Sequence, residues 1–328
     1  MGTMTFGEAW GFGASFAEVK KMFELYVEAG GNFFDTACNY QGGAAETALG
    51  ELTSQERDRF IFGTKYTMST VPGDVNAWGN HKKNLRRSIE GSLRRLKTDY
   101  VDLLYVHLWD YTTPVPEVLS ALDDLVHTGK VLHAAVSDAP AWIVAQANTW
   151  AEAHGRSPFA ALQIEYNLLE RSVEHELLPM ARAFDLPVLA WSPLAFGVLS
   201  GKFHDGTLSS RRGEWANGYL GPRADAVVPV VIAVAKELGV SPAAVALAWL
   251  RGRAATIFPI VGARTPDQLR DNIGSLAVEL SPEQRSRLDE VSVLAPTFPA
   301  KMWTNSLVVD GVLSGGTAPN LRGWEHPR

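Results

Sequence analysis

Short apolar runs alternate with longer amphipathic stretches along most of this 328-residue chain. Eight of the short runs are rich in β-branched or aromatic residues and are bounded by Gly, Pro or polar residues, which is the pattern of strands. We expect these strands at Met1–Phe6, Asn32–Asp35, Phe60–Lys65, Tyr100–His107, His133–Asp138, Leu162–Tyr166, Val188–Trp191 and Ile257–Val261.

The amphipathic stretches repeat apolar residues three and four positions apart, which predicts helices packed on a sheet. We expect them at Phe16–Ala29, Asn84–Lys97, Pro114–His127, Ala141–His154, Glu174–Phe184, Ala226–Leu238, Pro242–Arg251 and Pro266–Ser275. Eight strands alternating with helices predict an α/β fold, a single-domain (β/α)8 TIM barrel. A doubly wound open sheet is the alternative. However, the first strand is not followed by a turn with G-x-G-x-x-G spacing.

Two stretches interrupt this alternation. Ala195–Pro222 is rich in Gly, Ser and Arg and is long for a strand-to-helix connection, so we expect a binding loop. Residues 295–328 hold Pro, Gly and Asn without a period, so this tail either folds over the barrel mouth or is partly disordered. The predicted barrel domain therefore covers residues 1–294.

Composition and charge exclude several classes of protein. The chain is 46% hydrophobic and 20% charged, which excludes a disordered or fibrous protein. Its 30 Lys and Arg against 36 Asp and Glu give a net charge of -6 without a long basic run, which argues against a dedicated nucleic-acid binder.

Cysteine, histidine and apolar-run statistics narrow the class further. Cys38 is the single cysteine, so an intrachain disulfide and a multi-cysteine zinc site are excluded, and the histidines lack metal-ligand spacing. We therefore expect no metal. No apolar run approaches the ~20 residues of a membrane span and no secretory signal is recognisable, so we expect no membrane association and a cytoplasmic location.

Polar residues terminate several of the predicted strands, where a barrel of this kind builds its active site. Strand two ends in Asp35 and is followed by Tyr40, strand three ends in Lys65, and strand four ends in His107. A tyrosine is a weak acid at neutral pH, but an adjacent lysine lowers its pKa, and an aspartate would pair with that lysine. A histidine would orient a carbonyl group. The set predicts protonation of an oxygen while another group delivers hydride to its carbon.

The motifs "FFDTACNY", "GTKY", "LLYVHLWD", "QIEYNLLER", "AWSPLAFGVLSGK" and "FPIVGARTPDQLRDN" together resemble, in order and spacing, those of the aldo-keto reductase superfamily from Met1 to about Asn272. The resemblance is to bacterial-type members and also to potassium-channel β-subunits. It implies a barrel that binds a nicotinamide cofactor, usually NADPH, across its mouth. It also implies that Tyr40 is the general acid, that Lys65 and Asp35 tune it, and that His107 orients the carbonyl.

The same resemblance implies the cofactor contacts. Ser137, Asp138 and Gln163 would hold the nicotinamide carboxamide, and Trp191 would stack on the ring. The remaining contacts fall into three groups: the pyrophosphate loop of Ser192, Leu194, Gly197, Leu199, Lys202 and Arg211; the adenosine end of Gly262, Arg264, Gln268, Asp271 and Asn272; and the floor of Gly2, Thr3 and Met4 with Asp35. Three tryptophans, Trp10, Trp109 and Trp303, are candidates for the substrate pocket.

The sequence departs from the family pattern at four points. Asp138 replaces the usual Asn and can accept a hydrogen bond from the carboxamide but not donate one. Ala45 stands where Ser is common, Asp271 stands where Glu is common, and the hairpin that usually precedes strand one is absent.

Taken together, these observations predict an NADPH-dependent reductase of an aldehyde or ketone, with a small carbonyl compound as its partner. A cofactor-binding regulatory subunit that resembles the channel-associated β-subunits is the alternative, because it would retain the same four catalytic residue types. A metal-dependent barrel hydrolase or lyase would need paired ligands at the strand ends, which the sequence lacks. The physiological substrate, the direction of the reaction and the oligomeric state are left open.

Overall fold

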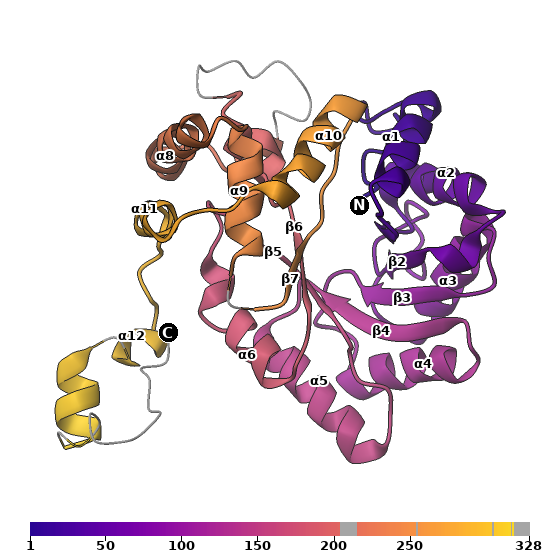
Figure 1. Cartoon of the computed structure of the whole chain (residues 1–328). Coiled ribbons are helices and arrows are strands. Elements are labelled where there is room, and N and C mark those ends of the chain that lie inside the picture. Colours follow the sequence, from indigo (N-terminus) through magenta and orange to yellow (C-terminus); the bar gives the residue numbers. More distant parts are fainter. Residues whose placement is uncertain (204–214, 254, 304, 316, 318–328) are drawn as a thin grey trace.

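The computed structural model describes residues 1–203, 215–253, 255–303, 305–315 and 317. Within these residues, seven parallel strands lie side by side in sequence order and form a curled sheet (Figure 1). They are β1 (Phe33–Asp35), β2 (Ile61–Tyr66), β3 (Val101–Val106), β4 (Val131–Ser137), β5 (Leu162–Glu165), β6 (Val188–Trp191) and β7 (Ile257–Pro259). Strands two to eight of the sequence prediction are therefore confirmed, with small shifts at their ends.

The first predicted strand, Met1–Phe6, is wrong as a continuous strand, because this segment forms only isolated parallel bridges, from Gly2 to Asp35 and from Phe6 to Ala14. The backbone N–H of Gly2 donates to the carbonyl of Val261 over 2.8 Å, and that of Thr3 donates to the carbonyl of Asp35 over 2.8 Å. Residues 1–3 thus join the two edges of the sheet at one point. The chain then turns at Met4 and Thr5 instead of continuing as a strand.

Helices surround the outside of the curled sheet in Figure 1. Those predicted are α1 (Phe16–Glu28), α3 (Lys82–Leu96), α4 (Val115–His127), α5 (Ala141–His154), α6 (Leu177–Ala183), α8 (Pro222–Leu238), α9 (Pro242–Arg251) and α10 (Pro266–Gly274). The stretch expected at Glu174–Phe184 divides into a 3-10 turn, Ser172–Glu174, and the shorter α6. Among the described residues, three α-helices were not predicted: α2 (Ala44–Thr53), α11 (Pro282–Ser292) and the short α12 (Ala300–Trp303). Of these, α11 packs against α8.

Successive side chains along each strand point to opposite faces of the sheet, so every second one points into the curl. Tyr105, Ala135, Ala161 and Leu189 form a small buried cluster within the curl, whereas the opposite face of the strands packs on the helices in the main core. One or two steps further along the same inward-facing rows come the polar residues at the carboxyl ends of the strands. The sheet therefore supports a polar site on an apolar base.

The tail beyond α11 contains the short helix α12 (Ala300–Trp303) and a π-helical stretch, Leu307–Leu313. In Figure 1 this part lies beyond α11, at the edge of the molecule. None of the described residues after Asn272 lines the cleft introduced below. The described part of the tail thus makes no cover over the cleft.

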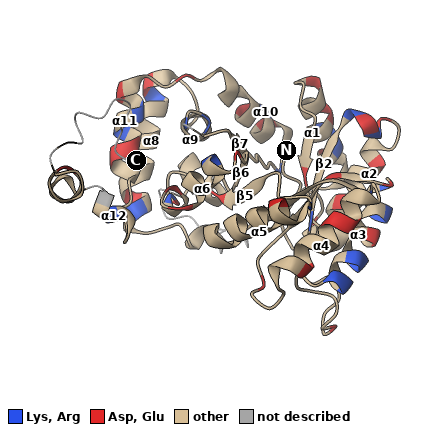
Figure 2. Cartoon of the chain, turned by 90° about the horizontal axis from the view of Figure 1, so that it is seen from below, with Lys and Arg blue, Asp and Glu red and all other residues tan. Residues whose placement is uncertain are grey.

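Charges of both signs are spread over the outer helices, as Figure 2 shows. The basic residues Lys82, Lys83, Arg86, Arg87 and Arg94 of α3 are exposed to solvent. Among the described residues, no single helix is long and apolar enough to cross a membrane; α8 and α9 satisfy the length and composition only as a pair, bent by 98°.

Candidate active site

A cleft of about 420 Å³ opens at the carboxyl ends of the strands. Its walls come from the strand ends, from the first ten residues, from the 3-10 turn Ala195–Ser200 and from α10. Most residues predicted from the sequence to form the site line it: Gly2, Met4, Trp10, Asp35, Tyr40, His107, Ser137, Asp138, Gln163, Trp191, Ser192, Leu194, Gly197, Lys202, Gly262, Gln268, Asp271 and Asn272.

Lys65 lies behind the wall of this cleft, between Asp35 and Tyr40. Its Nζ donates to Asp35 Oδ1 over 2.5 Å, to the carbonyl of Thr36 over 2.8 Å and to the Tyr40 hydroxyl over 3.4 Å. Asp35 pairs with Gly63 across β1 and β2, so Lys65, two residues further along β2, reaches the loop after β1. The structure therefore brings the predicted Asp, Lys and Tyr together, with Asp35 and Lys65 buried and Tyr40 partly buried at the cleft.

His107 completes the group from the end of β3. Its ring meets the Tyr40 ring edge-on, with 5.8 Å between centroids and 76° between planes. Its Nδ1 is buried and has no hydrogen-bond partner among the described residues. A buried polar atom in this state is costly unless a ligand or water satisfies it. The imidazole thus has hydrogen-bonding capacity to offer to a bound molecule.

The environment sets the charge state of each group. Burial lowers the pKa of Lys65, but Asp35 and Tyr40 outweigh burial and hold that pKa above its ordinary value, so Lys65 is protonated. Burial and the nearby Lys65 charge hold the pKa of His107 well below its ordinary value, so its imidazole is neutral at pH 7.

Tyr40 departs from the sequence-based expectation that Lys65 would bring its pKa down. Burial raises the pKa of Tyr40, and this effect exceeds the lowering by Lys65, so the net shift is upward. The physical reason is that a phenolate loses its hydration in the buried site, and Asp35 adds a second negative charge nearby. Tyr40 is therefore a protonated phenol at neutral pH, held beside an ammonium group.

Two of the residues predicted to hold the nicotinamide carboxamide, Gln163 and Asp138, form hydrogen bonds to other side chains of the protein. Gln163 Nε2 donates to Asp35 Oδ2 over 2.7 Å, so Gln163 helps to fix the aspartate that holds Lys65. Asp138 Oδ1 accepts from the indole Nε1 of Trp191 over 2.9 Å, which fixes the plane of the tryptophan ring at the cleft wall. Asp138 adopts a left-handed φ of 43°, directly after β4. The carboxylate of Asp138 thus accepts a hydrogen bond from the Trp191 indole, a group that can only donate.

The far part of the cleft lies between the turn Ala195–Ser200 and the start of α10. Thr265 caps α10 by accepting a hydrogen bond from the backbone N–H of Gln268, and the backbone N–H of Arg264 donates to Gln268 Oε1 over 3.0 Å. Arg264 does not line the cleft itself, but its Nε is buried without a hydrogen-bond partner among the described residues. A guanidinium at a helix N-terminus suits a phosphate.

Comparison with known proteins identifies the family. The model of the aldo/keto reductase family matches residues 1–293. The chain belongs to this family. The family implies an eight-stranded (β/α)8 barrel, with which the seven parallel strands and the bridge at Gly2 agree.

Several curated relatives of this aldo/keto reductase are fungal. The chain is 39% identical to norsolorinic acid reductase stcV of Emericella nidulans over 312 residues, which cover 91% of this chain and 79% of that protein. It is 35% identical over 342 residues to the putative aryl-alcohol dehydrogenase AAD14 of Saccharomyces cerevisiae, with 98% and 90% coverage. It is 36% identical to aldo-keto reductase ausK of Emericella nidulans, with 92% and 80% coverage. Family and relatives together show that this chain is an oxidoreductase.

The reductase differs from the sequence-based expectation at several individual residues. Trp109 does not line the cleft, because it is 5% exposed and packs in the hydrophobic core. Leu199 is likewise buried in the core, and Thr3 lies behind the wall, where its hydroxyl donates to the Asp35 carbonyl over 3.0 Å. Arg211 and the side chain of Trp303 lie outside the described residues, as do residues 204–214 of the expected binding loop.

Sequence reasoning missed two buried polar residues near Tyr40. Gln41 is 1% exposed and binds the loop of residues 4–12, and Glu46 is fully buried on α2. Glu46 accepts from the Thr64 hydroxyl over 2.6 Å and from Arg95 Nε over 2.7 Å, which ties α2 to β2 and α3. The segment of α2 is rich in Ala and Gly and has no clear apolar stripe, so it gave no helical signal.

Among the described residues there is no group of three or more His, Cys, Asp or Glu that would hold a metal ion.

Proposed function

We propose that this aldo/keto reductase uses NADPH to reduce an aromatic aldehyde or ketone to the alcohol, with Tyr40 as the proton donor. The observation that carries the proposal is the buried group of Asp35, Lys65 and Tyr40 at the cleft wall, with His107 beside it. That the substrate is aromatic is supported by the residues that line the cleft, among which Trp10, Phe196 and Trp215 accompany Tyr40. It is supported also by relatives named norsolorinic acid reductase and aryl-alcohol dehydrogenase.

In this proposal Tyr40 gives its phenolic proton to the carbonyl oxygen of the substrate. The raised pKa keeps the proton on the phenol until the oxygen gains negative charge, and Lys65 then stabilises the phenolate that is left. Asp35 keeps Lys65 in place and charged. The neutral His107 donates an N–H to the same carbonyl oxygen and fixes its direction toward Tyr40. NADPH, when bound, supplies hydride to the carbonyl carbon.

The described residues fit a dinucleotide of this kind. Trp191, fixed by Asp138, presents an aromatic face to the cleft for the nicotinamide ring, and Ser137 lies next to it. Lys202 lines the cleft beyond the turn Ala195–Ser200, in reach of a pyrophosphate. Arg264, with its unfilled Nε, and the N-terminus of α10 would hold the 2′-phosphate, with Gln268 and Asn272 near the adenosine.

The test is turnover of NADPH, followed through its absorbance, with a panel of aromatic and aliphatic aldehydes and ketones. We expect reduction of aromatic carbonyl compounds with a higher kcat/KM than that of aliphatic ones of similar volume. Tight NADPH binding without turnover of any carbonyl compound would instead support the alternative, a cofactor-binding regulatory subunit. Activity lost with a chelator and independent of NADPH would refute both.

A further inference from the structure

Gln41 directly follows Tyr40 and adopts a backbone conformation that a glutamine rarely takes. Its φ of 52° and ψ of 35° lie in the left-handed region, and Gly42 and Gly43 after it also have positive φ values of 67° and 96°. A glycine at position 41 would take this conformation without steric cost. The side chain must therefore gain something that offsets the strain, and strained residues of this kind concentrate at functional sites.

The Gln41 side chain is buried and uses its amide on a single loop of the chain. Nε2 donates to the carbonyl of Met4 over 3.0 Å and to the carbonyl of Phe12 over 3.1 Å, while Oε1 accepts from the backbone N–H of Trp10 over 2.9 Å. Both amide hydrogens are thus engaged at the two ends of residues 4–12, and the amide oxygen is engaged two residues before the second end. We call this arrangement the Gln41 clamp.

The loop that the Gln41 clamp holds carries Trp10 to the catalytic tyrosine. Trp10 lines the cleft, and its ring meets the Tyr40 ring edge-on, with 6.1 Å between centroids and 81° between planes. Phe12 supports Trp10 at a centroid distance of 6.1 Å. Tyr40 itself meets His107 edge-on. The clamp therefore joins the backbone next to the proton donor to an aromatic wall that adjoins the same phenol ring.

We propose that Gln41 is a positioning residue that determines substrate specificity: it fixes the loop of residues 4–12 so that Trp10 forms a rigid aromatic wall beside Tyr40. A flat aromatic ring attached to the carbonyl gains contact with such a wall, because aromatic rings at these distances attract one another beyond simple burial. An aliphatic carbonyl compound gains much less. The selection of aromatic substrates rests on the proposed reductase function, whereas the clamp itself does not.

Two variants of the full chain separate the clamp from the catalytic group. Gln41→Glu keeps the size and the acceptor but removes both donors, so the carbonyls of Met4 and Phe12 face a carboxylate. Gln41→Gly removes the side chain and relieves the backbone strain. If one of the two variants fails to fold, the other still tests the clamp. The matched control is Lys97→Gly, because Lys97 also has a left-handed φ, 53°, but is exposed at the end of α3, away from the cleft.

We expect both Gln41 variants to raise the KM for an aromatic aldehyde such as a nitrobenzaldehyde about tenfold, with kcat within about threefold of the wild type. For propanal the change in KM should be at least about fivefold smaller. Hydrogen exchange of the backbone amides in residues 4–12 should become about tenfold faster or more. The dissociation constant for NADPH should change by less than about twofold, and Lys97→Gly should match the wild type in every measurement.

Unchanged exchange in residues 4–12 would show that Gln41 does not hold the loop. Equal losses with nitrobenzaldehyde and propanal would show that Gln41 acts on Tyr40 in general and does not select aromatic substrates. If the wild-type protein reduced no carbonyl compound, the proposed reductase function would fail, whereas the exchange measurement would still decide the clamp.

Discussion

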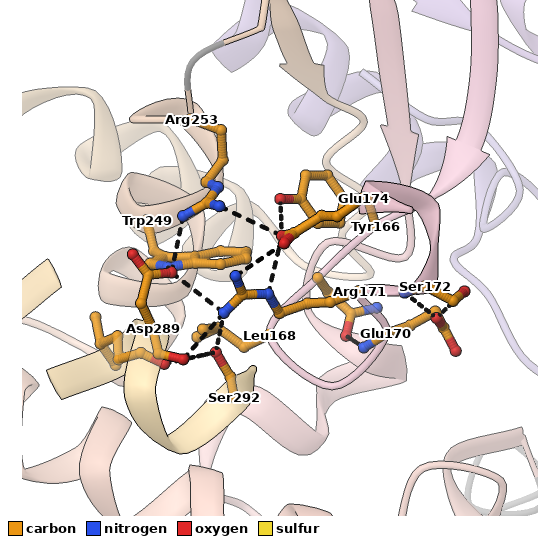
Figure 3. Close-up of polar contacts among 12 residues, drawn as sticks. Tyr166, Leu168, Glu170, Arg171, Ser172, Glu174, Trp249, Arg253, Asp289 and Ser292 are labelled. Carbon is orange, nitrogen blue, oxygen red and sulfur yellow. Dashed lines mark hydrogen bonds and ion pairs between the residues drawn. The ribbon is translucent and has the colours of Figure 1, made fainter. Parts of the chain in front are cut away.

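The cleft and the α11 side of the molecule each hold a group of charged residues around a buried one, Lys65 and Arg171 respectively, but the two groups differ in how fully their polar atoms are hydrogen-bonded. At the second place, which we call the anchoring cluster, Arg171, Glu174, Arg253 and Asp289 meet around Trp249 (Figure 3). Arg171 donates to both oxygens of Glu174, over 2.8 and 2.9 Å, and Asp289 accepts from Arg253 over 2.7 Å and from the Trp249 indole over 3.0 Å. Each charge has a partner of opposite sign.

Asp35, Lys65, Tyr40 and His107, which we propose to be catalytic and call the catalytic group, have hydrogen-bonding capacity left over instead. His107 Nδ1 has no partner among the described residues, and the Tyr40 hydroxyl meets Lys65 over a long 3.4 Å. The pKa values of the two acidic groups also shift in opposite directions. Arg171 and Arg253 hold the pKa of Glu174 below its ordinary value despite burial, whereas burial raises the pKa of Tyr40 despite the nearby Lys65. Buried charge alone therefore does not mark an active site. Unfilled hydrogen-bonding capacity beside a cleft does.

Replacing Tyr40 by phenylalanine tests the catalytic side of this comparison and should have the largest effect. Tyr40→Phe removes the proton donor but keeps the ring that packs against Trp10 and His107. We expect kcat/KM for an aromatic aldehyde to fall about 10²- to 10⁴-fold, the usual scale of general acid catalysis. The dissociation constant for NADPH, measured by fluorescence titration, serves as the control and should stay within a few-fold. Wild-type turnover by this variant would remove Tyr40 from the mechanism.

Replacing Arg171 by methionine tests the anchoring side. Arg171→Met leaves the half-buried Glu174 with Arg253 and Tyr166 only, and removes the bond to Ser292 Oγ at the end of α11. Because Glu174 loses two charge-assisted hydrogen bonds and, of its bonds to arginine, keeps only a longer one to Arg253, we expect the free energy of unfolding in urea to drop by about 1.5–3 kcal/mol. The kcat/KM per folded molecule should stay within a few-fold.

Lys21→Met is the matched control for this variant, since it breaks the solvent-exposed pair with Glu18 and should leave the urea transition unchanged. If Arg171→Met left stability unaltered and abolished catalysis, the two clusters would not differ in the way that their contacts indicate.

The sequence predicted the catalytic group better than the anchoring cluster, and the reason is positional. Asp35, Lys65 and His107 terminate short apolar strands, so the barrel geometry alone brings them to one edge. Arg171 and Asp289 come from a loop and from a helix that was not predicted, 118 residues apart. No periodicity links such residues. Their pairing depends on how α11 packs, which only the tertiary structure determines.

Residues near the strand ends were also mispredicted where packing decides their role. Trp109 follows His107 and was expected in the substrate pocket, but it faces the core. The expected fall in the pKa of Tyr40 failed for a related reason, because the sequence shows the neighbouring Lys65 but not the degree of burial. Gln41 gave no signal at all, because a left-handed glutamine whose partners are backbone atoms of another loop cannot be recognised from residue types.

Arg264 sharpens the comparison, because it also has a buried polar atom without a described partner but lies just before α10, whose residues Gln268, Asp271 and Asn272 line the cleft. If this unfilled capacity serves a ligand, Arg264→Ala should weaken NADPH binding about 10- to 100-fold and NADH binding only a few-fold. The reason is that the 2′-phosphate distinguishes the two cofactors and suits a guanidinium.

Arg270→Ala is the control for the same helix, since Arg270 is exposed and already paired with Asp267, so both cofactors should bind as in the wild type. Titrations with NADPH and NADH measure the ratio. If Arg264→Ala weakened the binding of NADPH and NADH equally, Arg264 would have a structural role, like the residues of the anchoring cluster, and would not recognise the 2′-phosphate.

The pH dependence of reduction should show the smallest effect, and its near absence is the prediction. The proposed reaction needs Tyr40 protonated and His107 neutral. Since the pKa of Tyr40 lies above its ordinary value of 10.0, the phenol keeps its proton as pH rises from neutral. Since the pKa of His107 lies well below its ordinary 6.5, the imidazole stays neutral as pH falls to that value. We expect kcat/KM at saturating NADPH to vary less than about twofold between pH 6.5 and about 9.5. A step in that profile near pH 6.5 would mean that His107 is solvated like an ordinary surface histidine, and a loss near pH 8 would mean that Lys65 outweighs burial at Tyr40.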